Sequence, residues 1–261
     1  MTEHFPTMTP TRRTVLLSLG AGLAAMALPR GGWAQAGDQV LRFGLSTFPP
    51  TIKPFDNTGG AANTVKLMLW RGLMGYDASA KLQPELAESV DWADPQTAVF
   101  KLRANAVFHN GKPVTAADVV YSLNEITKEG SSAYLKSDLA IISAVEAVDD
   151  KTVKISLSAP SAVLLDLLAS YCCPIISAES TEDAPIGAGP FTMKGSEKGV
   201  YIEVERFPDF YMEGEPNVGG IRFIAYADEN LRYAALEAGD VDLIEYLPWQ
   251  QFDAVDASDT L

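Results

Sequence analysis

The segment from Phe100 to Leu123 constrains the fold of this chain more than any other segment. Phe100 and Leu102 alternate with two basic residues, which is the pattern of a half-buried strand. Asn110-Gly111 then predicts a tight turn, because glycine tolerates a positive φ and asparagine nearly does. The segment therefore predicts a strand, a turn and a helix in direct succession.

The predicted helix has a recognisable start and one apolar face. Thr115 can cap its first turn, and Asp118 lies near the positive end of the helix dipole. Val119, Leu123 and Ile126 recur at spacings of four and three residues, so they share one side of the helix. Taken alone, these residues indicate a local fold element and no chemistry.

Patterns in the rest of the chain predict a mixture of helices and strands without repeats. Period-two alternation and β-branched runs predict strands at Val40–Leu45, Lys151–Leu157, Tyr201–Phe207, Ile221–Ala225 and Val241–Ile244. Helical spacing predicts helices at Asn63–Arg71 and Val163–Leu168, and a third helix that passes through Leu231, Ala235 and Leu236. Asp228 can cap the last of these, and Gly239 can end it. A tight glycine turn is expected at Ile186–Phe191.

Several of these segments resemble, in order, the motifs of the family 5 extracellular solute-binding proteins. The matching segments are Lys81–Ser89, Phe100–Leu123, Ile186–Phe191, Pro208–Pro216 and Arg232–Asp242. Two positions depart from the family pattern, since Ala188 replaces a threonine and Asp240 replaces a glutamate. The resemblance covers nearly the whole chain after residue 36.

The resemblance implies an α/β (mixed α+β) fold, a periplasmic binding protein type II-like lobe with an inserted extra α+β domain. Residues 37–71 and 178–254 would form the first lobe, and residues 72–177 the extra domain. Family members have two lobes around a cleft, so residues 255–261 would be the truncated start of a crossover to an absent second lobe. A lobe without its last strands exposes sheet edges. We therefore expect the chain alone to aggregate or to bind its ligand weakly.

The function that the resemblance implies is capture of a solute outside the cytoplasmic membrane and its delivery to an inner-membrane ABC permease. No catalytic residue, cofactor or metal is implied, and a monomer is expected. Short peptides, either oligopeptides or dipeptides, are the expected solutes. The family also takes nickel complexes, glutathione, opines and oligosaccharides. The alternatives are an exported hydrolase-like enzyme and a non-transport adaptor or sensor.

Seven residues are candidates for ligand contact by the same resemblance. The segment Asn57–Gly60 matches an extended family loop that holds peptide backbones, and its two adjacent glycines permit close backbone approach. The alternative is that this segment is only a flexible surface loop. The others are aromatic residues at the expected cleft and hinge, where packing in the core or at the surface is the alternative. The candidates are Asn57, Thr58, Gly59, Gly60, Tyr134, Tyr246 and Trp249.

The first 36 residues have the layout of an export signal of the twin-arginine type. Arg12-Arg13 precedes an apolar run from Val15 to Leu28, and Ala34-Gln35-Ala36 offers a small-residue cleavage site. The run is too short to span a bilayer comfortably. A periplasmic protein cleaved after about Ala36 is expected.

Charge and histidine content argue against several other classes of protein. With 34 acidic and 20 basic residues, the net charge of −14 repels nucleic acid and anionic lipid. One of the two histidines, His4, lies in the predicted signal, so a Ser-His-Asp triad would depend on His109. No Gly-x-Ser-x-Gly elbow occurs in the sequence, and the histidines are too few for a histidine-rich metal site.

The only two cysteines, Cys172 and Cys173, are neighbours in the sequence. In an oxidising compartment they could form a strained bond with each other or a bridge to another molecule. Two buried free thiols are the favoured alternative, because free cysteine is among the most buried residue types.

Overall fold

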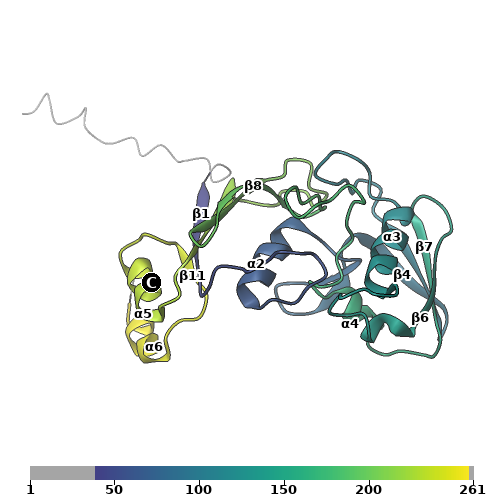
Figure 1. Ribbon diagram of the computed structural model, residues 1–261, viewed down its shortest axis with the longest axis horizontal. Coiled ribbons are helices and arrows are strands. Elements are labelled where there is room, and N and C mark those ends of the chain that lie inside the picture. Colours follow the sequence, from purple (N-terminus) through teal and green to yellow (C-terminus); the bar gives the residue numbers. More distant parts are fainter. Residues whose placement is uncertain (1–38, 259–261) are drawn as a thin grey trace, which may run out of the picture. The chain divides into compact units, whose positions relative to one another are not determined.

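A five-stranded and a four-stranded sheet organise the part of the chain that the computed structural model describes, residues 39–258 (Figure 1). The predicted export signal and cleavage site lie outside the described residues, as do positions 259–261 of the predicted crossover. The described residues all belong to one unit by their internal contacts. None of the helices among residues 39–258 has the length and apolar character needed to cross a bilayer.

The five-stranded sheet is mixed, with a parallel group at one side. Its order is β11 (Leu243–Ile244), β1 (Val40–Leu45), β10 (Gly220–Ala225), β9 (Tyr201–Arg206) and β8 (Phe191–Glu197). β1 is parallel to both β10 and β11, whereas β9 is antiparallel to β10 and to β8. The carboxyl ends of β1, β10 and β11 therefore meet at one edge of the sheet.

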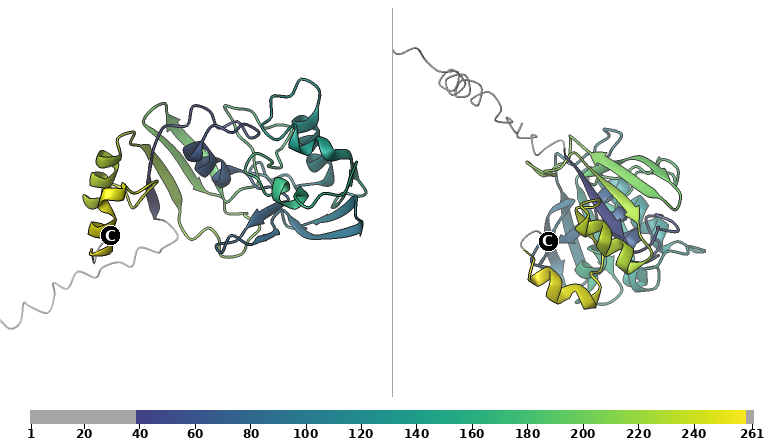
Figure 2. Two further views of the ribbon diagram at one scale, coloured as in Figure 1. Left: turned by 90° about the horizontal axis from the view of Figure 1, so that it is seen from below. Right: turned by 90° about the vertical axis from the view of Figure 1, so that its left-hand side faces the viewer.

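Helices pack on this sheet at both ends of the strand order. α2 (Gly60–Leu69) contacts β8, and α5 (Glu229–Glu237) contacts β1 and β11, beside the short η3 (Trp249–Gln251) and α6 (Phe252–Asp256) (Figure 2). The side chain of Asp228 accepts the N–H groups of Asn230 and Leu231, each at 2.9 Å. The predicted cap of α5 is thus confirmed.

The four-stranded sheet is antiparallel and is covered by a helix. Its order is β4 (Ala87–Asp94), β5 (Thr97–Leu102), β7 (Thr152–Leu157) and β6 (Ile142–Ala147), and α3 (Ala116–Thr127) packs on β6 and β7. Before β4 in the chain, β2 (Met74–Tyr76) and β3 (Leu82–Pro84) form an antiparallel hairpin. The short η2 (Asp138–Ile141) precedes β6, and the short α4 (Leu164–Leu168) follows β7.

The strand, turn and helix predicted from Phe100 to Leu123 are confirmed. Phe100 is fully buried in β5, and Gly111 has φ of 78° in the turn. Asp118 accepts the backbone N–H of Thr115 at 2.8 Å and its hydroxyl at 2.6 Å, which fixes the start of α3. The predicted apolar face of α3 is buried. This segment links β5 of the four-stranded sheet to α3, the helix that covers the sheet.

The segment predicted as a tight glycine turn, Ile186–Phe191, is instead a loop that bends at Gly189 and Pro190. Close approach to α2 is the physical reason for its glycines. A Cβ atom at Gly187 would lie 2.0 Å from the carbonyl oxygen of Leu69, at the end of α2. The N–H of Gly189 donates to the same oxygen at 3.0 Å. The loop therefore fastens the carboxyl end of α2.

Several element predictions need correction. The helix predicted at Asn63–Arg71 begins earlier, at Gly60, and ends at Leu69. No strand was predicted for β2, β3, β4, β6 or β8. Of these, β4, β6 and β8 are edge strands with register shifts and few buried positions. The family-like turn at Lys81–Ser89 is part of β3 and β4. The division into a lobe and an extra domain stays a prediction.

Candidate functional site

The edge where the parallel strands end gathers polar groups from distant parts of the chain. Ser46 follows β1, Tyr226 follows β10 and Glu245 follows β11. Ligands of open α/β sheets bind outside the carboxyl ends of parallel strands. This edge is therefore the first place to look for a binding site.

Glu245 is fixed at this edge by hydrogen bonds to the end of β1. Its backbone N–H donates to the carbonyl oxygen of Gly44 at 2.8 Å. Its Oε2 atom accepts the N–H of Ser46 at 2.9 Å and the hydroxyl of Ser46 at 2.7 Å. The carboxylate has a defined position that the strand pairing sets.

Tyr246 has a left-handed backbone, with φ of 56°, which costs a non-glycine residue about 1–3 kcal/mol. Arg232 of α5 holds it there. Its Nη2 donates to the carbonyl oxygen of Tyr246 at 3.0 Å, and its Nη1 donates to that of Tyr226 at 2.8 Å. Arg232 is only 3% exposed. A buried cation thus ties the residues that follow β10 and β11 to each other.

The predicted loop Asn57–Gly60 reaches this edge at its last residue. Gly59 has φ of 104°, which only glycine adopts readily, and Gly60 begins α2. A Cβ atom at Gly60 would lie 2.8 Å from Oε1 of Glu245 and 2.8 Å from the hydroxyl of Tyr246. The structure therefore brings together Gly60 and Tyr246 of the predicted residues.

The other two loop residues make local contacts. The hydroxyl of Thr58 donates to the carbonyl oxygen of Thr51 at 3.1 Å. The side-chain oxygen of Asn57 accepts the N–H of Gly59 at 3.4 Å. These bonds shape the approach of the loop to α2, and a ligand role for either residue stays a prediction.

The remaining predicted aromatic residues are exposed. Tyr134 is 58% exposed, and its N–H donates to the carbonyl oxygen of Phe55 at 3.0 Å, which joins its segment to the residues before Asn57. Trp249 is 73% exposed on η3, and among residues 39–258 no recorded contact brings it to Gly60 or to Tyr134. Their contact with a ligand stays a prediction.

Sequence reasoning named neither Ser46 nor Glu245, and it assigned Arg232 no role at this edge. The contacts of the first two join residues 199 positions apart, which no spacing rule reveals. One signal was available, because a charged residue directly after the strand predicted at Val241–Ile244 lies at the carboxyl end of that strand.

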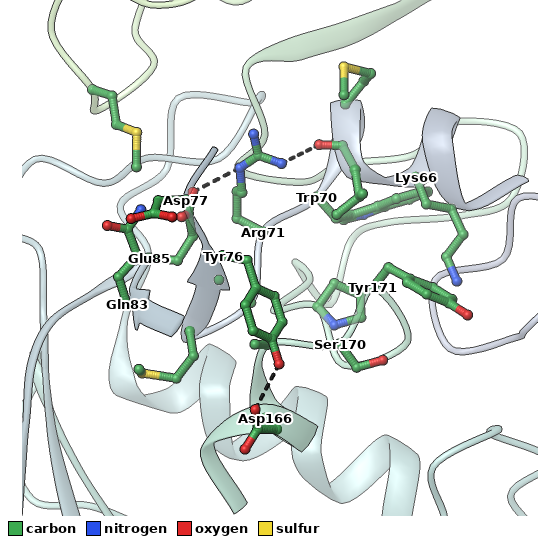
Figure 3. A pocket seen from close by; sticks show the side chains of 18 of the residues that line it. Lys66, Trp70, Arg71, Tyr76, Asp77, Gln83, Glu85, Asp166, Ser170 and Tyr171 are labelled. Carbon is green, nitrogen blue, oxygen red and sulfur yellow. Dashed lines mark hydrogen bonds and ion pairs between the residues drawn. The ribbon is translucent and has the colours of Figure 1, made fainter. Parts of the chain in front are cut away.

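A cavity of about 730 Å³ lies elsewhere, beside the carboxyl end of α2 (Figure 3). Two pairs of its polar groups contact each other: Arg71 and Glu85 at 2.9 Å, and the hydroxyl of Tyr76 and Asp166 at 2.8 Å. None of the seven predicted residues lines it. Gly60 is at the opposite end of α2, about 14 Å away along the ten-residue helix. The cavity and the strand-end edge are therefore separate features.

One wall of this cavity contains a buried lysine beside a cysteine. Nζ of Lys66 donates to the carbonyl oxygen of Asp56 at 2.6 Å and lies 3.8 Å from Sγ of Cys172. Burial lowers the pKa of Lys66, raises that of Cys172 and raises that of Cys173 to about 12. Both cysteines are free and buried, which confirms the favoured expectation. Thiols with raised pKa values are poor nucleophiles.

His109 uses both ring nitrogens within the fold. Nε2 lies 3.1 Å from the carbonyl oxygen of Gly189, and Nδ1 accepts the N–H of Gly187 at 3.3 Å. The ring also packs edge-on against Phe207. This arrangement requires the neutral imidazole with its proton on Nε2, and burial lowers the pKa of His109 to about 4. The geometry is that of a structural histidine.

We expect His109 to make folding stability depend on pH in acid. The unfolded chain binds this proton near pH 6.5 and the folded chain only near pH 4, so the free energy of unfolding falls as pH drops between these values. The loss from this group should be about 2–3 kcal/mol by pH 4. Urea unfolding at pH 7, 6, 5 and 4 measures it. His109→Gln should flatten the curve, and an unchanged curve would contradict the assignment.

Metal ligands do not gather in the described part of the chain. Among residues 39–258, no three side chains of histidine, cysteine, aspartate or glutamate are placed to hold one ion.

Comparisons with known proteins find similarity to bacterial solute-binding proteins. The profile of the bacterial extracellular solute-binding proteins, family 5 middle, matches residues 81–261. The glutathione-binding protein GsiB of Pectobacterium atrosepticum is 29% identical over 97% of this chain and 50% of its own length. The chain spans about half the length of the curated relatives it matches.

Two solved structures carry the same fold. The PBP AgaA of A. tumefaciens R10, in complex with agropinic acid, is 38% identical, with a TM-score of 0.81 over 84% of this chain and 46% of that chain. Haemophilus influenzae OppA, in complex with RPPGFSPFR, is 25% identical, with a TM-score of 0.77 over 84% of this chain and 48% of that chain. The predicted fold class, a mixed α/β lobe of the periplasmic binding protein type, is confirmed.

Proposed function

Because the chain belongs to the bacterial extracellular solute-binding proteins of family 5, we propose that it captures a small solute outside the cytoplasmic membrane and delivers it to an ABC permease. In this proposal, export depends on the predicted signal in residues 1–36, and no covalent step is involved. The solute would bind at the carboxyl ends of β1, β10 and β11, and closure around it would be what the permease recognises.

The observation that carries the proposal is the arrangement around Gly60. A residue without a side chain lies directly against the carboxylate of Glu245 and the hydroxyl of Tyr246. A charge and a hydrogen-bonding hydroxyl thus converge against a glycine at a sheet edge where ligands bind in this class of fold. Catalysis finds less support here, because the ring nitrogens of His109 are both engaged by backbone groups.

We propose short peptides as the solute. The glycines of the predicted loop permit close approach of a ligand backbone, which is what β-augmentation requires. Two of the similar proteins are described with peptides, glutathione for GsiB and RPPGFSPFR for OppA. AgaA is described with agropinic acid, so an opine is the competing outcome.

The test is mass spectrometry of the solute that co-purifies with the natively isolated chain. We expect peptides to be enriched, and we expect Gly60→Leu to reduce them at least about tenfold by displacing the carboxylate of Glu245 and the hydroxyl of Tyr246. Gly195→Leu is the matched control, because nothing lies within 4 Å of a Cβ atom there. An opine in place of peptides would refute the peptide assignment. Equal solute on wild type and Gly60→Leu would refute this site.

A further inference from the structure

Lys66 and Cys172 form a buried pair that the proposed solute site does not use. Lys66 is 1% exposed and Cys172 is fully buried, and their polar atoms, Nζ and Sγ, lie 3.8 Å apart. Both atoms donate to one acceptor, the carbonyl oxygen of Asp56, at 2.6 Å and 3.2 Å. This shared carbonyl oxygen holds an amine and a thiol side by side, although the two residues are 106 positions apart in the chain.

Lys66 lies where a positive charge is poorly supported. Its recorded partners among residues 39–258 are the carbonyl oxygen of Asp56, the thiol of Cys172 and the ring of Tyr171, whose centroid is 5.4 Å from Nζ. None of these groups carries a full negative charge, and burial lowers the pKa of Lys66. The fraction of neutral amine is therefore increased, and only the neutral amine has a lone pair free for bond formation.

The two neighbouring thiols differ in their surroundings, and Cys172 is the more reactive of them. Burial raises the pKa of Cys172, and the adjacent amino group of Lys66 opposes that effect. Cys173 has no recorded contact with a lysine among residues 39–258, and burial raises its pKa to about 12. Because oxidation of a thiol follows its thiolate character, Cys172 is oxidised before Cys173.

The cavity of about 730 Å³ beside α2 gives a small oxidant a route to this pair. Lys66 and Tyr171 both line it (Figure 3), and Cys172 follows Tyr171 directly in the chain. Dioxygen is small and uncharged, so it can enter an apolar wall that excludes ions. An oxygen atom inserted between Nζ and Sγ requires a smaller movement than a direct nitrogen–sulfur bond, since the two atoms are 3.8 Å apart.

We propose that Lys66 and Cys172 form a modification site, at which dioxygen inserts one oxygen atom between Nζ and Sγ to give a covalent N–O–S bridge. One N–H bond, the S–H bond and the O–O bond break, while an N–O bond, an O–S bond and the two O–H bonds of a water molecule form. Nitrogen and sulfur lose two electrons each, and dioxygen accepts all four. The inference is independent of the proposed function, because it uses no residue of the strand-end edge.

The test is the intact mass of the chain after exposure to air. The chain is purified with a reductant under argon, freed of the reductant and divided between argon and air-saturated buffer. Air should add the mass of one oxygen atom and remove that of two hydrogen atoms, and a thiol reductant should reverse the change. Isotopically labelled dioxygen should place the heavy isotope in the product, and proteolysis should release one linked pair of peptides that contains Lys66 and Cys172.

Cys172→Ser is the informative variant, because its hydroxyl can still donate to the carbonyl oxygen of Asp56 but cannot form the bridge. Lys66→Arg likewise keeps a donor for Asp56 and lacks the amine. Both variants should lose the mass change completely. Cys173→Ala is the matched control, since it removes the neighbouring buried thiol and should keep the mass change of the wild type.

Several results would overturn the bridge. They are an unchanged mass in air, a product that the thiol reductant does not reverse, a mass change that Cys172→Ser or Lys66→Arg retains, and a mass change that Cys173→Ala abolishes. Loss of two hydrogen atoms without added oxygen would also overturn it, because that is the product of a disulfide between the two cysteines or of a direct nitrogen–sulfur bond.

Discussion

Replacing Arg232 with methionine is expected to lower the free energy of unfolding by about 2–4 kcal/mol. The side chain is 3% exposed, and it donates to the carbonyl oxygens of Tyr226 and Tyr246. Methionine keeps much of the volume and none of the donors, so both carbonyl oxygens lose their partner and Tyr246 loses the bond that offsets its positive φ. Urea titration of the chain measures the loss as a lower midpoint at constant slope.

The same substitution at Arg222 is the matched control. Arg222 lies on β10 of the same sheet, but its side chain is 43% exposed, and its ion pair with Glu203 spans 3.5 Å. Exposed pairs of this kind contribute about 0–1 kcal/mol, so Arg222→Met should change stability little. Equal effects of the two substitutions would show that the buried hydrogen bonds of Arg232 contribute nothing specific. We also expect Arg232→Met to weaken solute binding, because Tyr246 would no longer be held over Gly60.

The elements that could be predicted from sequence are those with complete local signals. β1 is predicted with both ends correct, because a mostly apolar run, interrupted by Arg42, is bounded by polar and proline-rich sequence. α5 is predicted because Asp228 and Gly239 mark its two ends, and the structure places a cap and a positive φ of 71° there. Interactions within a few residues decide such elements, so sequence suffices for them.

The edge strands β6 and β8 and the candidate site could not be predicted in the same way. β6 and β8 each have one neighbour, so their alternation is weak, and partners distant in sequence decide their pairing. The site brings Gly60 together with Glu245 across the sheet. Gly60 and Tyr246 were predicted only because they match positions of the family pattern. The roles of Asn57, Tyr134 and Trp249 stay predictions.

The two ends of α2 connect the candidate site to the rest of the fold. Its first residue, Gly60, faces Glu245 and Tyr246, and the loop at Gly187 and Gly189 fastens its last residue, Leu69. A helix of ten residues is rigid over this length, so displacement of its carboxyl end would move Gly60 as well. The site therefore depends on glycines far from it in space and in sequence.

Gly187→Ala is accordingly expected to destabilise the chain by about 3 kcal/mol or more. The new Cβ atom would lie 2.0 Å from the carbonyl oxygen of Leu69 and 2.5 Å from a ring carbon of Trp70. The first obstacle is backbone, which cannot turn aside as a flexible side chain can, so the loop and α2 must separate. That separation also strains the bond from Gly189 to Leu69. The measurement is urea unfolding, with soluble yield as a second readout.

Gly195→Ala isolates this steric effect from the general effect of replacing a glycine. Gly195 lies in β8, no atom lies within 4 Å of its Cβ position, and its φ is outside the left-handed region. Alanine there restricts only the unfolded chain, so stability should stay within about 0.5 kcal/mol or rise slightly. If Gly187→Ala were tolerated as well as Gly195→Ala, the loop would not be packed against Leu69, and the link between this loop and the position of Gly60 would be lost.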